Sequence, residues 1–194
     1  MKISFKLRGV FLAAALLSAA ALPSACSPDG AQSQAPSADH ASIGELVTSF
    51  RAAWESKDFD QMLDVTMPPL LLGELMRLDG IDESQRGNIR KQLVTITSQA
   101  LKEAKLVELT VDVDSAKIES SSAGRRYATM PVTFVMDMNG QRLRSVGTYL
   151  ALQDGGRWYL LSLSDASNIN SVRAAYPDLA QIPMSPPKLE ATSL

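Results

Sequence analysis

The hydrophobic pattern of this chain changes from a helical period, in residues 42–104, to a strand period after Lys105. In segment 42–56 the apolar residues recur three and four positions apart: Ile43, Leu46, Val47, Phe50 and Trp54. Ser42 with Glu45 three residues later has the form of a capping box, which marks a helix N-terminus. The pattern therefore predicts an amphipathic helix over 42–56.

Further helices are predicted before any strand. Asp60 can cap a short helix over 61–66, and Pro68-Pro69 suits the first turn of a helix over 70–78. A longer helix is predicted over 82–104, with an inward face made of Ile89, Leu93, Ile96, Ala100 and Leu101. A last helix is expected over 167–176, after the strands.

Alternating apolar and polar residues then predict strands. Val107, Leu109, Val111 and Val113 alternate with polar residues and should share one face of the first strand. A weaker strand is predicted over 116–121, and the last strand over 157–164.

The clearest element is a hairpin that joins strands 126–138 and 141–153 through Asn139-Gly140. Asn-Gly supplies the two positive-φ positions of a two-residue type I′ turn, so paired residues should have numbers that sum to 279. This register produces two cross-strand pairs of opposite charge, Asp137 with Arg142 and Arg125 with Asp154. A β-bulge near Pro131 or Gly147, which would shift the register farther from the turn, stays open as an alternative.

Helices followed by antiparallel strands define an α+β fold and argue against a doubly wound sheet. We predict N-terminal helices packed on a curved, cone-like antiparallel sheet, in a single domain over 42–176. A signal peptide and a flexible tether precede it. Residues 177–194 include four prolines and are predicted to form a loosely ordered tail.

The first 25 residues have the pattern of an export signal. A basic start with Lys2, Lys6 and Arg8 is followed by an apolar run over 10–22, which is too short to span a bilayer. Segment 22–26, Leu-Pro-Ser-Ala-Cys, resembles the cleavage box of bacterial lipoproteins, in which the cysteine is acylated and becomes the new N-terminus. Pro23 departs from that pattern, because the box usually has leucine at this position.

The resemblance implies lipidation at Cys26. Ser27, in place of aspartate, resembles sorting to the outer membrane, with the domain facing the periplasm. A soluble periplasmic or secreted protein is the alternative. Residues 26–41 lack large apolar side chains and are predicted to be a flexible tether, in which His40 is a solvated residue.

The composition of the chain argues against several kinds of partner and functional site. The chain has 194 residues with 19 basic and 21 acidic side chains, a net charge of −2. Removing Lys2, Lys6 and Arg8 with the leader leaves 16 basic side chains, a net charge of −5, so nucleic acid is not an expected partner. One cysteine and one histidine cannot supply an intramolecular disulfide, a structural zinc site or a Ser-His-Asp triad, and neither a metal nor a cofactor is expected.

The order of elements resembles the nuclear transport factor two-like superfamily, which includes the ketosteroid isomerase-like enzymes. An amphipathic first helix, Asp58-Phe59-Asp60 before a short helix, a long hairpin, and Asp154-Gly155-Gly156-Arg157-Trp158-Tyr159-Leu160 carry the resemblance over residues 42–165. The predicted helix over 82–104 is longer than the usual third helix of that family. A cystatin-like sheet wrapping one helix is an alternative arrangement.

The resemblance implies a conical cavity between the sheet and the first helix. Its candidate ligand-binding residues are Trp54, Met130, Val132, Phe134, Met136, Ser145, Gly147 and Tyr149. The small Ser145 and Gly147, which face Phe134 and Val132 in the register, could leave ligand space or bend the strand. Ordinary core packing is the alternative role of this methionine-rich face.

Proton-transfer enzymes of this superfamily use a carboxylate base with a tyrosine or a protonated acid as oxyanion donor. The chain has those residue types, at Asp112, Asp114, Asp137, Tyr127, Tyr149 and Tyr159. None of them matches the family motif, so no catalytic residue is assigned.

The favoured function is a non-catalytic envelope lipoprotein that binds a protein partner or a small apolar ligand through its sheet or cavity. The alternatives are a ketosteroid isomerase-like pocket enzyme and a structural or protective factor in envelope assembly. A homodimer formed through the sheet is a further open arrangement.

Overall fold

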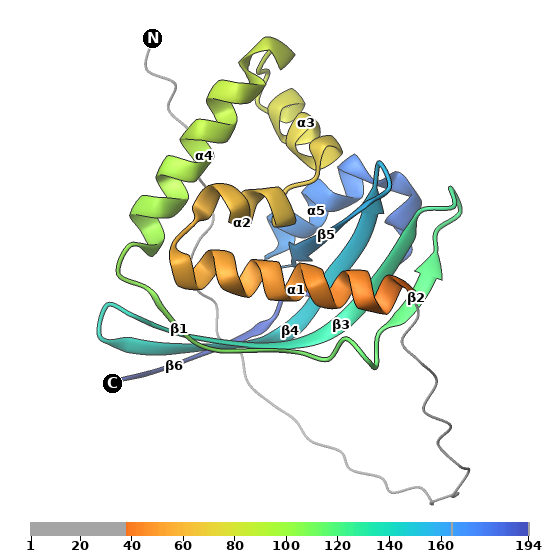
Figure 1. Ribbon diagram of the computed structural model, residues 1–194. Helices are drawn as coiled ribbons and strands as arrows, with labels where there is room; N and C mark the ends of the chain where they lie inside the picture. The colour runs from red at the N-terminus through yellow and green to blue at the C-terminus, as the bar shows by residue number, and fades with distance from the viewer. Residues whose placement is uncertain (1–37, 164, 194) are drawn as a thin grey trace, which may run out of the picture.

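The computed structural model describes residues 38–163 and 165–193. The helices and strands follow in this order: α1 Ala38–Ser56, α2 Phe59–Thr66, α3 Pro69–Leu78, η1 Glu83–Gln85, α4 Arg86–Leu101, β1 Lys105–Val111, β2 Lys117–Ser120, β3 Arg126–Met138, β4 Gln141–Asp154, β5 Arg157–Ser162, α5 Ala166–Ala175, η2 Pro177–Leu179 and β6 Lys188–Ser193. The fold is α+β, as predicted, with helices on a curled antiparallel sheet that forms a half-barrel (Figure 1). No described helix is long and apolar enough to cross a membrane.

Two long strands, β3 and β4, form the centre of the six-stranded sheet. Both β1 and β2 pair with β3, whereas both β5 and β6 pair with β4. The β3–β4 ladder keeps the predicted register from Met138↔Gln141 to Tyr127↔Leu152 without a shift, so the alternative of a bulge in this hairpin is wrong. Asn139 and Gly140 have positive φ angles, which the predicted turn requires.

Both predicted charge pairs are present. The guanidinium of Arg142 donates to the two carboxylate oxygens of Asp137 over 2.8 and 3.0 Å. Arg125 Nη1 lies 3.5 Å from Asp154 Oδ1. The turn chemistry of one dipeptide thus determines contacts up to 14 residues away from it along the chain on each side.

The first strand contains an irregularity that the alternating pattern conceals. Leu106 pairs with Met136 and Leu109 with Phe134, so β1 has one residue more than β3 between these two pairs. Val107 is the extra residue of this bulge, and its side chain is 49% exposed. The prediction that Val107 shares the inward face with Leu109 is therefore wrong, because the bulge reverses the alternation at that point.

The helices α1 and α2 cover the inner face of the sheet. Their apolar side chains pack against the inward residues of β1, β3, β4 and β5 in one buried cluster: Ile43, Leu46, Phe50, Ala53, Trp54, Phe59, Met62, Val65, Ala104, Leu109, Ala116, Ala128, Met130, Val132, Ala151, Trp158 and Leu160. Arg51 of α1 also donates to the carbonyl oxygen of Leu109. The predicted amphipathic face of the first helix is thus the face that meets the sheet.

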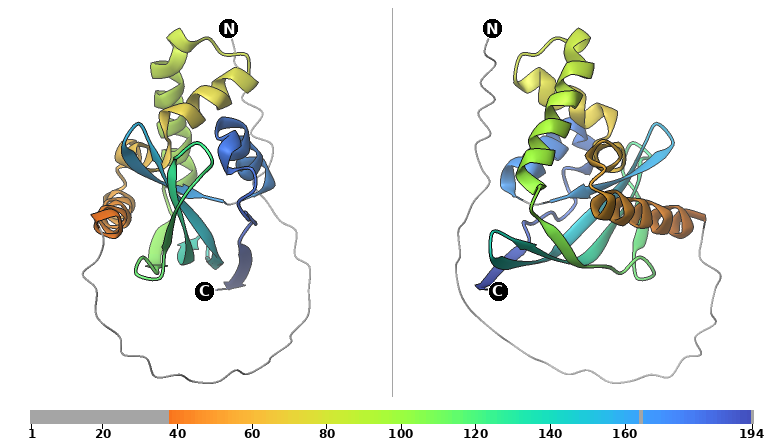
Figure 2. Two further views of the ribbon diagram at one scale, coloured as in Figure 1. Left: turned by 90° about the vertical axis from the view of Figure 1, so that its right-hand side faces the viewer. Right: turned by 60° about the vertical axis from the view of Figure 1, so that its left-hand side comes forward.

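The outer face of β4 and β5 is covered by α5, η2 and Leu71 of α3. Figure 2 shows α1 and α5 on opposite sides of the sheet. Leu150, Leu152 and Leu161 of the sheet pack against Val172 of α5 within a second buried cluster. The half of the sheet that carries β5 is therefore buried on both faces.

A polar network fastens α5 and η2 to the sheet. Arg125 Nε donates to Asp178 Oδ2 over 3.2 Å, and the hydroxyl of Ser121 donates to the same oxygen. The fully buried Tyr176 donates to Asp154 Oδ2 over 3.1 Å, and its ring lies 4.6 Å from the guanidinium carbon of Arg125. Burial, followed by the negative charge of Asp154, raises the pKa of the Tyr176 hydroxyl.

The C-terminal segment differs from the predicted tail. Leu179 and Ile182 are buried in the outer cluster, and Lys188–Ser193 form β6 beside the first half of β4. Both β5 and β6 therefore pair with the same edge of β4: β5 with its second half, and β6, after α5 and η2, with its first half. Backbone pairing to β4 orders this segment, and a polar, proline-rich sequence gives little sign of such pairing.

The first helix begins at Ala38, four residues before the predicted start, so residues 38–41 are not part of a tether. His40 is half-buried and its Nε2 lies 2.9 Å from the carbonyl oxygen of Ala116, which corrects its assignment as a solvated residue. Asp39 forms an ion pair with Arg126 of β3. Ser42 Oγ donates to the carbonyl oxygen of Ala38 and is therefore inside the helix and not at its cap.

Two other helix boundaries also differ from prediction. Asp58, not Asp60, caps α2 by accepting a hydrogen bond from the amide of Gln61. The predicted long helix is divided into η1 and α4 and ends at Leu101, and Ala100, which was expected inward, is exposed. The predicted leader over 1–25, Cys26 and the remaining tether up to residue 37 lie outside the described residues.

Candidate binding site on the inner face of the sheet

The inner face has two ends with different packing. At one end Trp54, Met130 and Val132 are 6%, 0% and 4% exposed and are packed between α1 and the sheet. Half-buried apolar side chains contact this core at both ends: Val111, Val113 and Ile118 lie beside this first end. A second half-buried group lies at the other end of the face. We call this second group the half-buried apolar cluster: Val94 and Leu101 of α4, Leu106 of β1, and Phe134, Met136 and Met138 of β3.

The structure brings six of the sequence-predicted ligand residues, Trp54, Met130, Val132, Phe134, Met136 and Tyr149, to this one face. The rings of Trp54 and Phe134 meet edge to face with centroids 5.0 Å apart, and Phe50 meets Tyr149 in the same geometry at 6.4 Å. Trp54 therefore lies at the boundary between the packed core and the half-buried apolar cluster.

Two polar groups are buried among these aromatic rings. The indole Nε1 of Trp54 has no hydrogen-bond partner within residues 38–163 and 165–193. Leaving such a donor unpaired costs about 1–3 kcal/mol. Burial raises the pKa of the Tyr149 hydroxyl to about 12, against the opposing effect of a hydrogen bond with Ser162, so this phenol is neutral near pH 7.

Ser145 and Gly147 do not leave the open patch that their size suggested. A Cβ atom added at Gly147 would lie 2.5 Å from the Cβ and 2.8 Å from the Cα of Pro187. Ser145 pairs with Leu189 of β6, which is 68% exposed. The glycine therefore allows the returning C-terminal segment to approach β4, and Pro187 occupies the volume that was expected for a ligand.

The carboxylates that were considered for proton transfer lie elsewhere. Asp112 and Asp114 are exposed after the end of β1, and Asp112 accepts a hydrogen bond from the amide of Ser115. Asp137 is held by Arg142, whose hydrogen bonds lower the pKa of that carboxyl. The tyrosines at 127 and 159 belong to the outer cluster. The structure thus brings none of these carboxylates to Tyr149.

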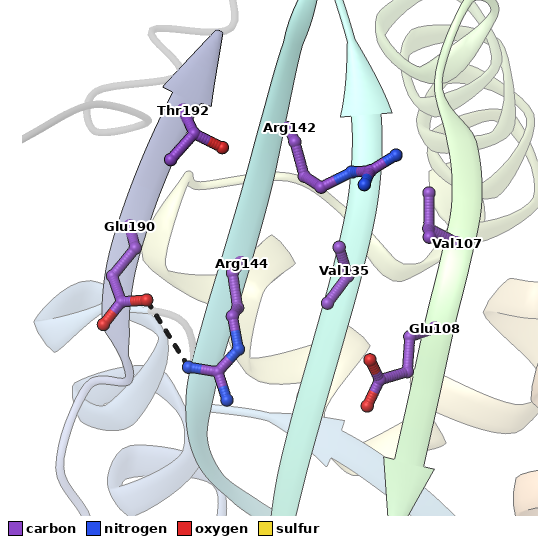
Figure 3. A pocket seen from close by; sticks show the side chains of 7 residues that line it. All are labelled: Val107, Glu108, Val135, Arg142, Arg144, Glu190 and Thr192. Carbon is purple, nitrogen blue, oxygen red and sulfur yellow. Dashed lines mark hydrogen bonds and ion pairs between the residues drawn. The ribbon is translucent and has the colours of Figure 1, made fainter. Parts of the chain in front are cut away.

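A depression of about 280 Å³ lies on the opposite, outward face of β1, β3, β4 and β6 (Figure 3). Its lining residues are Val107, Glu108, Val135, Arg142, Arg144, Glu190 and Thr192. Arg144 Nη1 lies 3.4 Å from Glu190 Oε2, and both arginine side chains are nearly half exposed. Because the basic groups already face carboxylates and are solvated, this depression is a weak candidate for an anion site.

The sequence could not reveal the outward depression, since two of its walls come from the β1 bulge and from β6. No group of histidine, cysteine, aspartate and glutamate side chains in the described part of the chain could hold a metal ion. In comparisons with known proteins, no family and no curated protein matches the chain. The inner face, with its unpaired indole and its half-buried apolar cluster, is the strongest candidate site.

Proposed function

We propose that this chain is a non-catalytic bacterial envelope lipoprotein with a nuclear transport factor two-like domain, which binds a small apolar ligand at the half-buried apolar cluster. Lipid attached to Cys26 would hold the domain at the outer membrane, facing the periplasm. The leader and its cysteine box support the anchor. The curled sheet with α1 across its inner face supports the assignment of the domain.

The observation that carries the proposal is the convergence of half-buried apolar side chains from α4, β1 and β3 beside a fully packed core. A ligand placed there would remove apolar surface from water, and each Å² removed contributes about 25 cal/mol. Met136 and Met138 are suited to this role, because unbranched thioether side chains adapt to irregular shapes.

The test is a titration of the purified domain with diphenylhexatriene, a hydrocarbon whose fluorescence rises in apolar surroundings. Met136→Lys should weaken binding at least about tenfold, since a charge in an apolar contact costs more than 1.4 kcal/mol unless it is paired. Thr110→Lys is the matched control, because Thr110 is exposed on the next strand.

Leu143→Lys is the second variant, because Leu143 is half-buried and pairs with Met136. Circular dichroism and thermal unfolding check that each variant folds. Equal binding by wild type, Met136→Lys and Leu143→Lys would contradict the proposed site.

A protein partner on the same face is the second candidate. Leu189 of β6 continues the inward row of Leu109, Phe134 and Ser145 across the sheet, and at 68% it is the most exposed large hydrophobic residue within 38–163 and 165–193. Leu189→Lys separates the two functions, since it should reduce envelope crosslinks to a partner and leave diphenylhexatriene binding unchanged.

A further inference from the structure

The strand β6 is an edge of the sheet whose outer side is unpaired among the described strands. It pairs over its whole length with the first half of β4, and with no other strand in 38–163 and 165–193. Its register with β4 is regular, whereas the edge strand β1 is interrupted by the bulge at Val107. A bulge hinders an edge strand from pairing with another chain, and β6 lacks this protection.

The backbone groups of β6 point alternately toward β4 and toward the outer edge. The two-residue turn makes Gln141 bond to β3, so Arg144, three residues later, directs its backbone N–H and C=O toward β6. Arg144 pairs with Glu190, which is therefore a residue that bonds to β4. Leu189 and Ala191, on either side of Glu190, consequently direct their N–H and C=O groups to the outer edge.

The charged side chains of the outward face alternate in sign across the sheet. Figure 3 shows a row that runs from Glu108 on β1, past Val135 on β3, to Arg144 on β4 and Glu190 on β6. The next position beyond Glu190 is the outer side of the edge strand. A basic side chain at that position would continue the alternation, because opposite charges on neighbouring strands attract.

We propose that two copies of this chain join through their β6 strands, antiparallel and related by a two-fold axis at Leu189. Lys188 then lies opposite Glu190 of the second copy, on both sides of the axis, and continues the row of alternating charges. On the inner face each exposed Leu189 meets its equivalent. The inference rests on the second candidate function, for which it names the partner, and it does not require the small-ligand site.

The order of residues in β6 favours this axis. The two copies of Leu189 exchange two backbone hydrogen bonds, and Ala191 N–H donates to the carbonyl oxygen of Pro187 of the second copy. An axis at Glu190 would place two carboxylates opposite each other, which is destabilising. An axis at Ala191 would leave Lys188 and Glu190 without opposite charges. The effect of charge on association therefore distinguishes the possible registers.

The experiment measures association by sedimentation equilibrium on the mature chain with Cys26→Ser, so that neither lipid nor a free thiol joins the copies. The chain with an unchanged β6 should form a reversible dimer. Lys188→Glu should weaken it at least about tenfold, because both opposite-charge pairs become like-charge pairs. Lys117→Glu is the matched control: the same change of charge on the exposed Lys117 of β2 should leave the dimer within about twofold.

A mixture of two variants tests the register itself. Glu190→Lys should also fail to dimerise, because it too creates two like-charge pairs. When Lys188→Glu and Glu190→Lys are mixed, opposite charges face each other again at both positions, so the mixture should form a dimer that neither variant forms alone. Recovery in the mixture also shows that both variants fold.

Each other outcome overturns a defined part of the reasoning. A chain with an unchanged β6 that stays monomeric up to millimolar concentration overturns the inference. A dimer that neither substitution weakens overturns the axis at Leu189, as does a mixture that stays monomeric while circular dichroism shows that both variants are folded. The titration with diphenylhexatriene tests the small-ligand site separately, so the two proposals can fail independently.

Discussion

Replacing Gly147 by alanine tests how the C-terminal segment is attached to the sheet. The new Cβ would lie 2.5 Å from Pro187 Cβ, about 1 Å closer than ordinary contact, and one of the two segments must shift. The described side chains of β6 are all exposed, so this strand is held mainly by its backbone pairing to residues 141–146. We therefore expect β6 to detach before the core deforms.

The free energy of unfolding should fall by about 1–3 kcal/mol, the cost of mild overpacking that the edge strand β6 relieves by moving. This corresponds to a fall in Tm of about 2–12 °C. Hydrogen exchange locates the effect. Amides of 188–193, and those amides of 141–146 that point toward β6, should exchange faster in Gly147→Ala, while amides of 149–154 stay protected because this half of β4 lies between β3 and β5.

Gly44→Ala is the matched control. A Cβ at Gly44 meets nothing within 4 Å, so the substitution should stabilise α1 by about 0.5–1 kcal/mol. Unchanged protection of 188–193 in Gly147→Ala would refute the close approach of Pro187. Lost protection throughout β3, β4 and β5 would refute the weak attachment of β6.

Further predictions concern the anchor, the polar network and a buried phenol. Cys26→Ala should abolish acylation and move the protein from the membrane fraction to the soluble fraction, and unmodified Cys26 in the wild-type mature protein would contradict this. Asp178→Ala should cost about 2–4 kcal/mol in urea unfolding, since it leaves a largely buried guanidinium short of a partner, whereas exposed Asp114→Ala should change stability by less than about 0.5 kcal/mol. The folded-state pKa of Tyr149 is raised from 10.0 to about 12, so its contribution to stability is complete below pH 10 and is lost as the pH rises toward 12. Tyr149→Phe should remove that part of the alkaline loss of stability, and an unchanged pH profile would contradict the buried phenol.

The parts of the fold that sequence predicted well depend on local chemistry. The Asn139-Gly140 turn determines its own geometry, and through it the register and the Asp137–Arg142 pair. The first helix could be recognised because its apolar face is continuous, but the position of its first residue could not be predicted. Asp39 and His40 extend it by contacts with Arg126 and Ala116, which are far away in the sequence.

The errors arise where distant segments determine the conformation. The bulge at Val107 is visible only when β1 is paired with β3, since the alternating valines look regular by themselves. The strand β6 follows prolines and buries no side chain among those described, so only its pairing with β4 orders it. Gly147 appeared to leave open space beside β4, because Pro187, which fills that space, is 40 residues away in the sequence.

The candidate site was predicted in part. The alternating pattern of β3 placed Met130, Val132, Phe134 and Met136 on one face, and that placement is confirmed. The pattern could not show how far each of these side chains is buried, because burial depends on how the helices cover the sheet. Nor could it show that the indole of Trp54 lacks a partner.

Native mass spectrometry of the protein extracted from its own host membrane tests the central proposal most directly. The account predicts a chain that begins at Cys26, carries covalent lipid, and retains a small apolar compound that is lost from Met136→Lys and kept by Thr110→Lys. A lipidated wild-type chain without any such compound, or with the same compound retained by Met136→Lys, would contradict it.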